Sequence, residues 1–160
     1  MITFNVTAAS GKTKILILEI IAASFILLFV YAAASKLIDH AGFLHSLQNS
    51  PLLQSFAKSL SWLVPFTEIA ISILLFSPKL KKAGLLFSVF LMTAFTFYIA
   101  YMLLFIPHLP CSCGGALKNM TWTQHLIFNI VITMLGIIGW RISKSNEDVI
   151  AINRASRTPV

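Results

Sequence analysis

Residues 15–35 read ILILEIIAASFILLFVYAAAS, and this run decides the class of the protein. It contains one charged residue, Glu19, and its length matches the roughly 20 apolar residues that a helix needs to cross the ~30 Å core of a bilayer. A helix satisfies its own backbone hydrogen bonds, so such a segment is stable in lipid. The run is longer than the apolar part of an ordinary signal peptide. Lys36 and further apolar segments follow Ala32–Ala34, so we expect a retained first membrane span.

Three more apolar runs follow, which predicts four membrane spans. Hydrophobic residues make up 58% of the 160-residue chain and charged residues only 11%, against about 25% charge in soluble domains. We therefore expect an all-α membrane protein, a four-helix up-down-up-down bundle formed by a single domain over residues 1–142, with residues 143–160 as a polar cytoplasmic tail. The predicted spans cover approximately residues 15–35, 60–77, 83–106 and 122–142.

The connection between the first two spans has a different character. Residues 39–59 mix polar residues with apolar ones that include Phe43 and Leu47, and Pro51 interrupts the segment. An amphipathic segment of this kind is typical of a helix that lies at the membrane surface. We expect an interfacial helical segment here, broken near Pro51.

The basic residues predict the orientation of the spans. The net charge of +7 does not indicate a nucleic-acid partner, because the basic residues form short clusters between apolar runs. Loops rich in Lys and Arg stay in the cytoplasm, so we expect both termini there, in the inner membrane of a bacterial cell. Glu19 is expected to reach the cytoplasmic interface near Lys14 or the Lys81–Lys82 turn. The cytoplasmic side would hold Lys12, Lys14, Lys79, Lys81, Lys82, Arg141, Lys144, Arg154 and Arg157, and the outer side only Lys36, Lys58 and Lys118.

The chain has two cysteines, Cys111 and Cys113, and both lie in the predicted outer loop, residues 107–121. Disulfides form in the compartment outside the inner membrane. A disulfide closed over one intervening residue has poor geometry, and it stabilises little because it closes almost no chain. Strain makes such a bond more reducible. Gly114 and Gly115 supply the backbone freedom for the turn. A redox pair therefore fits this spacing better than a structural clip.

Two alternatives to the redox reading stay open. His108 and His125 could join Cys111 and Cys113 around a soft metal ion, although the one-residue spacing of the cysteines is not that of zinc sites; we predict no metal site. Alternatively, the protein is a scaffold or maturation subunit whose cysteines only shape their loop. The same two histidines are also the nearest bases to the thiols in sequence. These residues do not distinguish an enzyme from a redox accessory subunit.

Ionisable and amide groups occur inside the predicted spans. Glu68 lies deep in the second span, three residues after Pro65, and a carboxylate there must be neutralised or paired. Lys36, at the outer end of the first span, has a side chain long enough to reach it. Glu68 could relay protons from the thiols or tie the first two helices together. Asn129 in the fourth span is expected to hydrogen-bond between helices.

The third span is rich in aromatic residues. Tyr98, Tyr101 and Phe105 share one face near its outer end and could line a slot for a quinone ring. Contact with lipid or with a neighbouring helix is the more common use of such residues. A quinone is therefore a possible cofactor, and the sequence requires none.

Three stretches resemble the MauE/DoxX group of redox-associated membrane proteins. They are Ala34–Asp39 at the end of the first span, Pro65 with Glu68 in the second, and Pro110–Gly115, which is followed by Trp122 and Asn129. The likeness extends from about Tyr31 to Trp140, and the CxC motif followed by glycine is its most specific part.

The resemblance implies a four-helical protein that passes oxidising or reducing equivalents to periplasmic thiols. Cys111 and Cys113 would be the catalytic pair, and a thioredoxin-like protein or a thiol client would be the partner. The group's named member is needed to make methylamine dehydrogenase. Members close to it carry Phe before the first glycine of the loop, whereas Gly114 follows Cys113 directly here. We therefore predict no role in methylamine metabolism.

Overall fold

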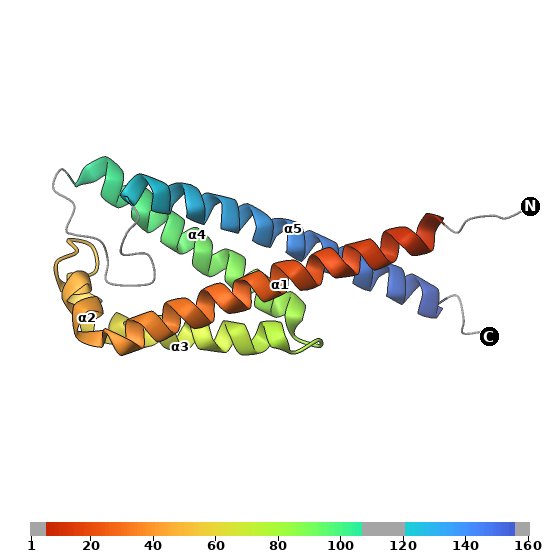
Figure 1. Ribbon diagram of the computed structural model, residues 1–160, viewed down its shortest axis with the longest axis horizontal. Helices are drawn as coiled ribbons and strands as arrows, with labels where there is room; N and C mark the ends of the chain where they lie inside the picture. The colour runs from red at the N-terminus through yellow and green to blue at the C-terminus, as the bar shows by residue number, and fades with distance from the viewer. Residues whose placement is uncertain (1–5, 107–120, 156–160) are drawn as a thin grey trace, which may run out of the picture.

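The computed structural model describes residues 6–106 and 121–155, and all regular structure within these ranges is helical (Figure 1). Side chains are described for residues 13–106 and 121–144. The predicted all-α class is confirmed. The elements are α1 (Val6–Ile38), α2 (His40–Gln48), the 3-10 turn η1 (Gln54–Phe56), α3 (Ala57–Phe76), α4 (Lys81–Phe105) and α5 (Trp122–Ala155).

Four helical segments are long and apolar enough to cross a membrane, as predicted. In the most hydrophobic stretch of each of these segments, no more than a third of the residues is buried inside the protein. Many apolar side chains are therefore exposed on the outside of the bundle. This outward face is the one that lipid would solvate, since the helix backbone needs no partner from the bilayer. The protein is a multi-pass membrane protein. Its spans are Thr13–Ile38, Gln54–Phe76, Lys81–Phe105 and Trp122–Lys144.

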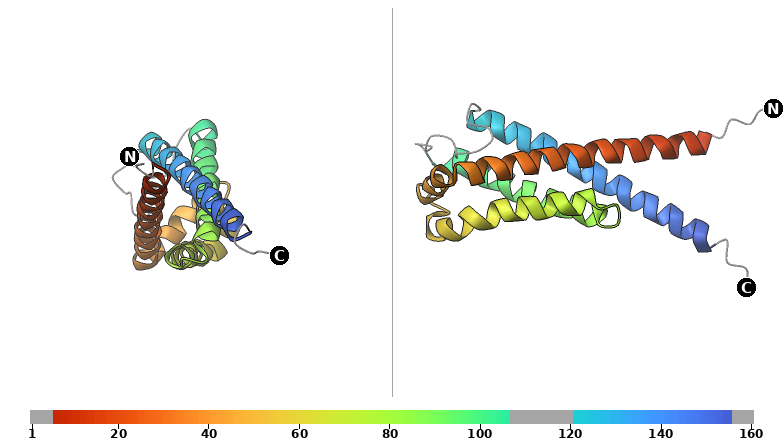
Figure 2. Two further views of the ribbon diagram at one scale, coloured as in Figure 1. Left: turned by 90° about the vertical axis from the view of Figure 1, so that its right-hand side faces the viewer. Right: turned by 60° about the horizontal axis from the view of Figure 1, so that its bottom comes forward.

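The last helix is longer than its apolar composition predicted. The sequence indicated a polar tail from residue 143, but α5 continues as helix to Ala155. Residues 143–155 contain neither Gly nor Pro, so nothing in this stretch interrupts the hydrogen-bond ladder of the preceding span. α5 has 34 residues and α1 has 33. Both therefore extend past the α3–α4 turn, as Figures 1 and 2 show.

The connector between α1 and α3 is the predicted broken helix. Asp39 caps α2, because its carboxylate accepts a hydrogen bond from the backbone N–H of Gly42 at 3.2 Å. α2 ends at Gln48, before the turn that contains Pro51, and η1 leads into α3. Phe43 and Leu47 are buried against Ala57, which fixes α2 on the first turn of α3.

The bundle is built from two helix pairs. α1 packs along α3 and α4 packs along α5, while α3 and α4 meet across their short turn and α1 closes the bundle against α5 (Figure 2). Gly84 permits the close approach of α4 to α3, because a Cβ there would lie 2.9 Å from the backbone nitrogen of Leu75. The largest buried apolar side chains of the core are Phe25, Phe29, Leu75, Leu85 and Met102.

The two ends of the bundle differ in what they carry. Figure 1 shows the start of α1, the α3–α4 turn and the end of α5 pointing one way. The Lys81 ammonium pairs there with Glu19, which confirms the predicted position of this acid beside the basic turn. The opposite end holds α2, η1, the end of α4 and the start of α5. The loop between α4 and α5 therefore leaves and rejoins the bundle at the end away from the termini.

Candidate functional site

The predicted redox motif lies outside the described residues, but both of its anchoring points are described. Cys111, Cys113, His108, Gly114 and Gly115 fall within residues 107–120. α4 ends at Phe105, and the N–H of Ile106 still donates to the carbonyl of Met102 at 3.1 Å. The structure therefore fixes where this segment starts.

The return of the chain is fixed by a capping box at the start of α5. The Gln124 N–H donates to Thr121 Oγ1 at 3.3 Å, and the Thr121 N–H donates to Gln124 Oε1 at 3.0 Å. This reciprocal pair satisfies two donors that the first helical turn leaves without partners. The helix consequently begins at Trp122, where the sequence placed the start of the fourth span.

A buried ion pair joins α1 to α3 in the interior of the bundle. Lys36 Nζ lies 2.7 Å from Glu68 Oε1, and the side chains of Lys36 and Glu68 are 14% and 1% exposed. The pairing expected from the sequence is therefore present. Lys36 Nζ also donates to the carbonyl of Ala32 at 3.3 Å, so the side chain folds back along its own helix instead of extending to the surface. Its ammonium lies 5.8 Å from the ring centroid of Phe43, which links α2 to the same pair.

The backbone around Glu68 is also rich in polar contacts. Pro65 is buried one turn earlier, and α3 remains a continuous helix through it. Thr67 Oγ1 donates to the carbonyl of Val64 at 2.7 Å, and Ser72 Oγ donates to the carbonyl of Glu68 at 2.9 Å. These hydroxyls are used within α3. Neither hydrogen bond supplies a donor to the Glu68 carboxylate.

α5 brings two more of the predicted supporting residues to the interior. Asn129 is 3% exposed, and His125 lies one turn before it on the same face of the helix. Lys36, Glu68, His125 and Asn129 come from three helices, and we call these four residues the polar cluster; among them, the direct contact that the structure describes is the Lys36–Glu68 pair.

Two atoms of the polar cluster make no hydrogen bond to another described residue. They are Glu68 Oε2 and Asn129 Nδ2, and both are buried. Buried polar groups are nearly always satisfied by protein or by ordered water.

The three aromatic residues considered for a quinone lie in different surroundings. The Tyr98 hydroxyl donates to Ser50 Oγ at 3.0 Å, so this ring is tied to the connector between α1 and α3. Tyr101 and Phe105 are exposed, and their ring centroids lie 5.0 Å apart. Their outward position is the one expected for contact with lipid.

Sequence reasoning missed two residues of the connector. Ser50 is 1% exposed and receives the Tyr98 hydroxyl, which joins α4 to a segment 48 residues away in sequence. The ring of His40 lies against that of Trp62, tilted by 35° with centroids 4.4 Å apart, and its buried Nε2 makes no hydrogen bond to another described residue. In the sequence, only the position of Ser50 before Pro51 could have pointed to it. Neither Ser50 nor His40 belongs to a periodic pattern that would predict its burial.

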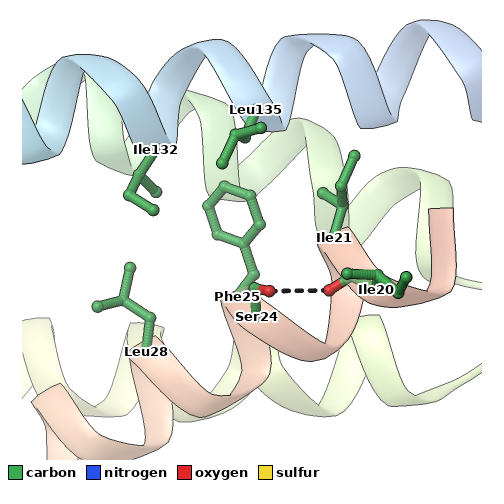
Figure 3. Close-up of a pocket in the computed structure, with 7 residues that line it drawn as sticks. All are labelled: Ile20, Ile21, Ser24, Phe25, Leu28, Ile132 and Leu135. Atoms are coloured by element: carbon green, nitrogen blue, oxygen red, sulfur yellow. Dashed lines mark hydrogen bonds between the residues drawn. The ribbon is translucent and has the colours of Figure 1, made fainter. Parts of the chain in front are cut away.

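A pocket between α1 and α5 has no polar group to offer. It has a cavity volume of about 120 Å³, and its one hydroxyl, on Ser24, donates to the carbonyl of Ile20 at 2.9 Å (Figure 3). The pocket therefore suits hydrocarbon only. Its lining consists of Ile20, Ile21, Ser24, Phe25, Leu28, Ile132 and Leu135.

The metal alternative rests mainly on residues outside the described part of the chain. Within residues 6–106 and 121–155, no three His, Cys, Asp or Glu side chains come together in a way that could hold a metal ion. Three of the four proposed ligands, His108, Cys111 and Cys113, lie outside these residues. His125 instead belongs to the polar cluster.

Comparison with known proteins identifies the family. No curated protein and no solved structure gives a significant match. One family model, described as methylamine utilisation protein MauE, matches residues 14–142, which include nearly all of the four spans and the whole polar cluster. Since the match covers most of the chain, this four-span membrane protein belongs to the MauE family.

Proposed function

We propose that the protein is a membrane thiol–disulfide redox protein that works through Cys111 and Cys113. The single observation that carries this proposal is the spacing of the two cysteines, the only ones in the chain, with one residue between them. This spacing is poor for a structural bridge and suited to a reactive one. Membership of the MauE family supports the proposal.

The sidedness of the bundle also supports it. Among the described residues, Lys14, Lys79, Lys81, Arg141 and Lys144 belong to the end with the termini, whereas the opposite end carries few basic residues. By the positive-inside rule the termini are cytoplasmic. The loop between α4 and α5 then faces the periplasm of a bacterial inner membrane, where disulfides persist.

The proposed reaction is thiol–disulfide exchange. In the oxidising direction for this protein, the thiolate of one cysteine attacks a disulfide of the partner and forms a mixed disulfide. The second cysteine then displaces the partner's sulfur, so Cys111 and Cys113 end as a disulfide and the partner as a dithiol. Two electrons and two protons pass to the partner, and the reverse reaction returns them. The partner is a thioredoxin-like protein or a client with accessible thiols.

In this proposal the polar cluster has a positioning role. The Lys36–Glu68 pair joins α1 to α3, and His125 and Asn129 lie on α5. α5 begins at the capping box where the cysteine segment returns. The ion pair would therefore hold α1, which packs against α5, and so support the helix that carries the returning end of the redox loop.

A mixed-disulfide trap tests the proposal. Cys111→Ser and Cys113→Ser are each expressed in cells, free thiols are blocked with acid and alkylating agent, and captured proteins are identified by mass spectrometry. We expect one of the two variants to accumulate a reducible adduct with a periplasmic protein, because the resolving thiol is missing. Ser112→Ala is the matched control and should accumulate none.

The same cells separate the redox role from a scaffold role. If the double variant Cys111→Ser/Cys113→Ser supports the cellular process as well as the wild type, and neither single variant captures a partner, the cysteines are structural. In that case the proposal is wrong and the scaffold reading replaces it.

A further inference from the structure

The pocket between α1 and α5 lies where these two helices diverge. Figures 1 and 2 show the helices crossing each other. Gly136 permits close contact of α5 with α1, because a Cβ there would lie 3.0 Å from Cζ of the Phe25 ring. One turn nearer the start of α5 the corresponding residue is Ile132, and the pocket opens between its side chain and that of Leu28 on α1 (Figure 3). The pocket is therefore a consequence of how the two helices cross.

The walls of the pocket favour hydrocarbon over water. Its rear wall belongs to the core, since Ile21 and Phe25 are 7% and 2% exposed. The hydroxyl of Ser24 already donates to the carbonyl of Ile20. A buried water needs two to four polar partners, whereas an apolar cavity of about 150 Å³ stays dry and binds benzene or xenon. The cavity volume here is about 120 Å³, which is enough for a small hydrocarbon group.

The rim of the pocket belongs to the lipid-facing surface of the bundle. Ile20 of α1 and Leu135 of α5 both line the pocket, and they are 58% and 39% exposed. Both residues lie within membrane spans, so their exposed sides meet lipid chains. The pocket can therefore be entered sideways from the bilayer.

The depth of the pocket indicates which part of a lipid reaches it. Ser24 is close to the middle of the span Thr13–Ile38. Ile132 and Leu135 are close to the middle of the span Trp122–Lys144. The hydrocarbon core of a bilayer is ~30 Å thick, and the acyl chains of the two leaflets end at its midplane. The end of an acyl chain therefore lies at the level of the pocket, whereas a headgroup does not.

We propose that this pocket, which we call the chain site, holds the terminal part of a phospholipid acyl chain. The chain enters from the side and gives the lining side chains the dispersion contacts that an empty pocket lacks. A helix of a second copy fits this place less well. Helices that associate in membranes bring small residues together, whereas the large side chains of Ile20 and Leu135 stand on the rim.

Photolabelling with a lipid probe tests the proposal. The full-length protein is reconstituted in phosphatidylethanolamine–phosphatidylglycerol vesicles that contain a phospholipid with a diazirine at the end of one acyl chain. After irradiation, adducts are assigned to residues by proteolysis and mass spectrometry. We expect Ser24 and Leu28 to be labelled severalfold more than Phe90 and Phe97. These two α4 residues are 73% and 72% exposed and represent ordinary lipid contact.

Variants show whether the label reports the chain site. Ser24→Leu places a larger side chain in the pocket and should lower the labelling of Leu28 and Ile132 severalfold. Ala94→Leu is the matched control, because Ala94 is exposed on α4 and the same enlargement there leaves the pocket open. Leu135→Phe fills the pocket from the opposite helix and serves as a second variant should Ser24→Leu not fold. Circular dichroism confirms the helix content of each variant.

Two results would overturn the proposal. Equal labelling of the chain site and of Phe90 and Phe97, or labelling that both filling variants leave unchanged, would show that the pocket holds no chain. Weaker labelling of the chain site than of the α4 residues would show that another protein surface covers it. The chain site involves no cysteine, and the thiols are blocked with N-ethylmaleimide throughout, so either result would leave the redox proposal standing.

Discussion

Replacing Lys36 with methionine would leave the Glu68 carboxylate buried without its ionic partner. Glu68 is 1% exposed, and its Oε1 lies 2.7 Å from Lys36 Nζ. Breaking a buried pair from one side costs about 3–5 kcal/mol, because the remaining charge is uncompensated. Lys36 is 14% exposed, so we expect the lower end of this range. A loss of about 3 kcal/mol lowers the folded-to-unfolded ratio roughly a hundredfold.

The double variant Lys36→Met/Glu68→Met should recover most of that loss. Replacing both members of a buried pair with apolar side chains of similar size is often neutral or stabilising. A double-mutant cycle should therefore give a coupling energy of about 2 kcal/mol or more. The measurement is unfolding of purified protein in mixed micelles with increasing sodium dodecyl sulfate, followed by circular dichroism.

The second ion pair of the protein supplies the matched control. Lys81 pairs with Glu19, whose side chain is 54% exposed, and exposed pairs contribute about 0–1 kcal/mol. Lys81→Met should therefore shift the unfolding midpoint much less than Lys36→Met. Equal shifts for the two variants, or a double variant no more stable than Lys36→Met, would refute the assignment of Lys36–Glu68 as a buried, coupled pair.

Three further changes test other parts of the structure by the same unfolding assay. Thr121→Ala should lower the free energy of unfolding by about 1 kcal/mol. Adding Gln124→Ala to this variant should lower it little further, because the two side chains cap α5 together; additive losses would contradict the capping box. Gly84→Val should cost about 1–3 kcal/mol, since its Cβ would meet the α3 backbone, and an unchanged midpoint would argue against that close approach. Tyr98→Phe should cost about 1 kcal/mol by leaving the Ser50 hydroxyl without its donor, and a Ser50→Ala background should remove the effect.

Much of the fold could be predicted because a helix that crosses a bilayer requires a long, uninterrupted run of apolar residues. Segments of about 20 apolar residues are unambiguous, and the four predicted spans agree with the helices to within a few residues, apart from the two ends that extend beyond the bundle. The Lys36–Glu68 pair was also predictable. An acid deep in a span needs a partner, and few basic residues lie near enough in the topology to provide one.

Other features depend on tertiary contacts that periodicity does not reveal. The continuation of α5 to Ala155 was missed because hydropathy marks the end of the apolar run and not the end of the helix. Ser50 meets Tyr98 only because the connector folds against α4. The burial of Asn129 likewise depends on how α5 packs against its neighbours, although the residue was noted in the sequence.

Thiol labelling in intact cells tests the central claim most directly, because Cys111 and Cys113 are the only cysteines. Bacteria expressing the protein are briefly reduced and treated with a membrane-impermeant maleimide, before and after permeabilisation. Our account predicts labelling of both cysteines in intact cells, and less labelling when the reduction step is omitted, because the pair is then partly a disulfide. Labelling that appears only after permeabilisation would place the pair in the cytoplasm and contradict the account.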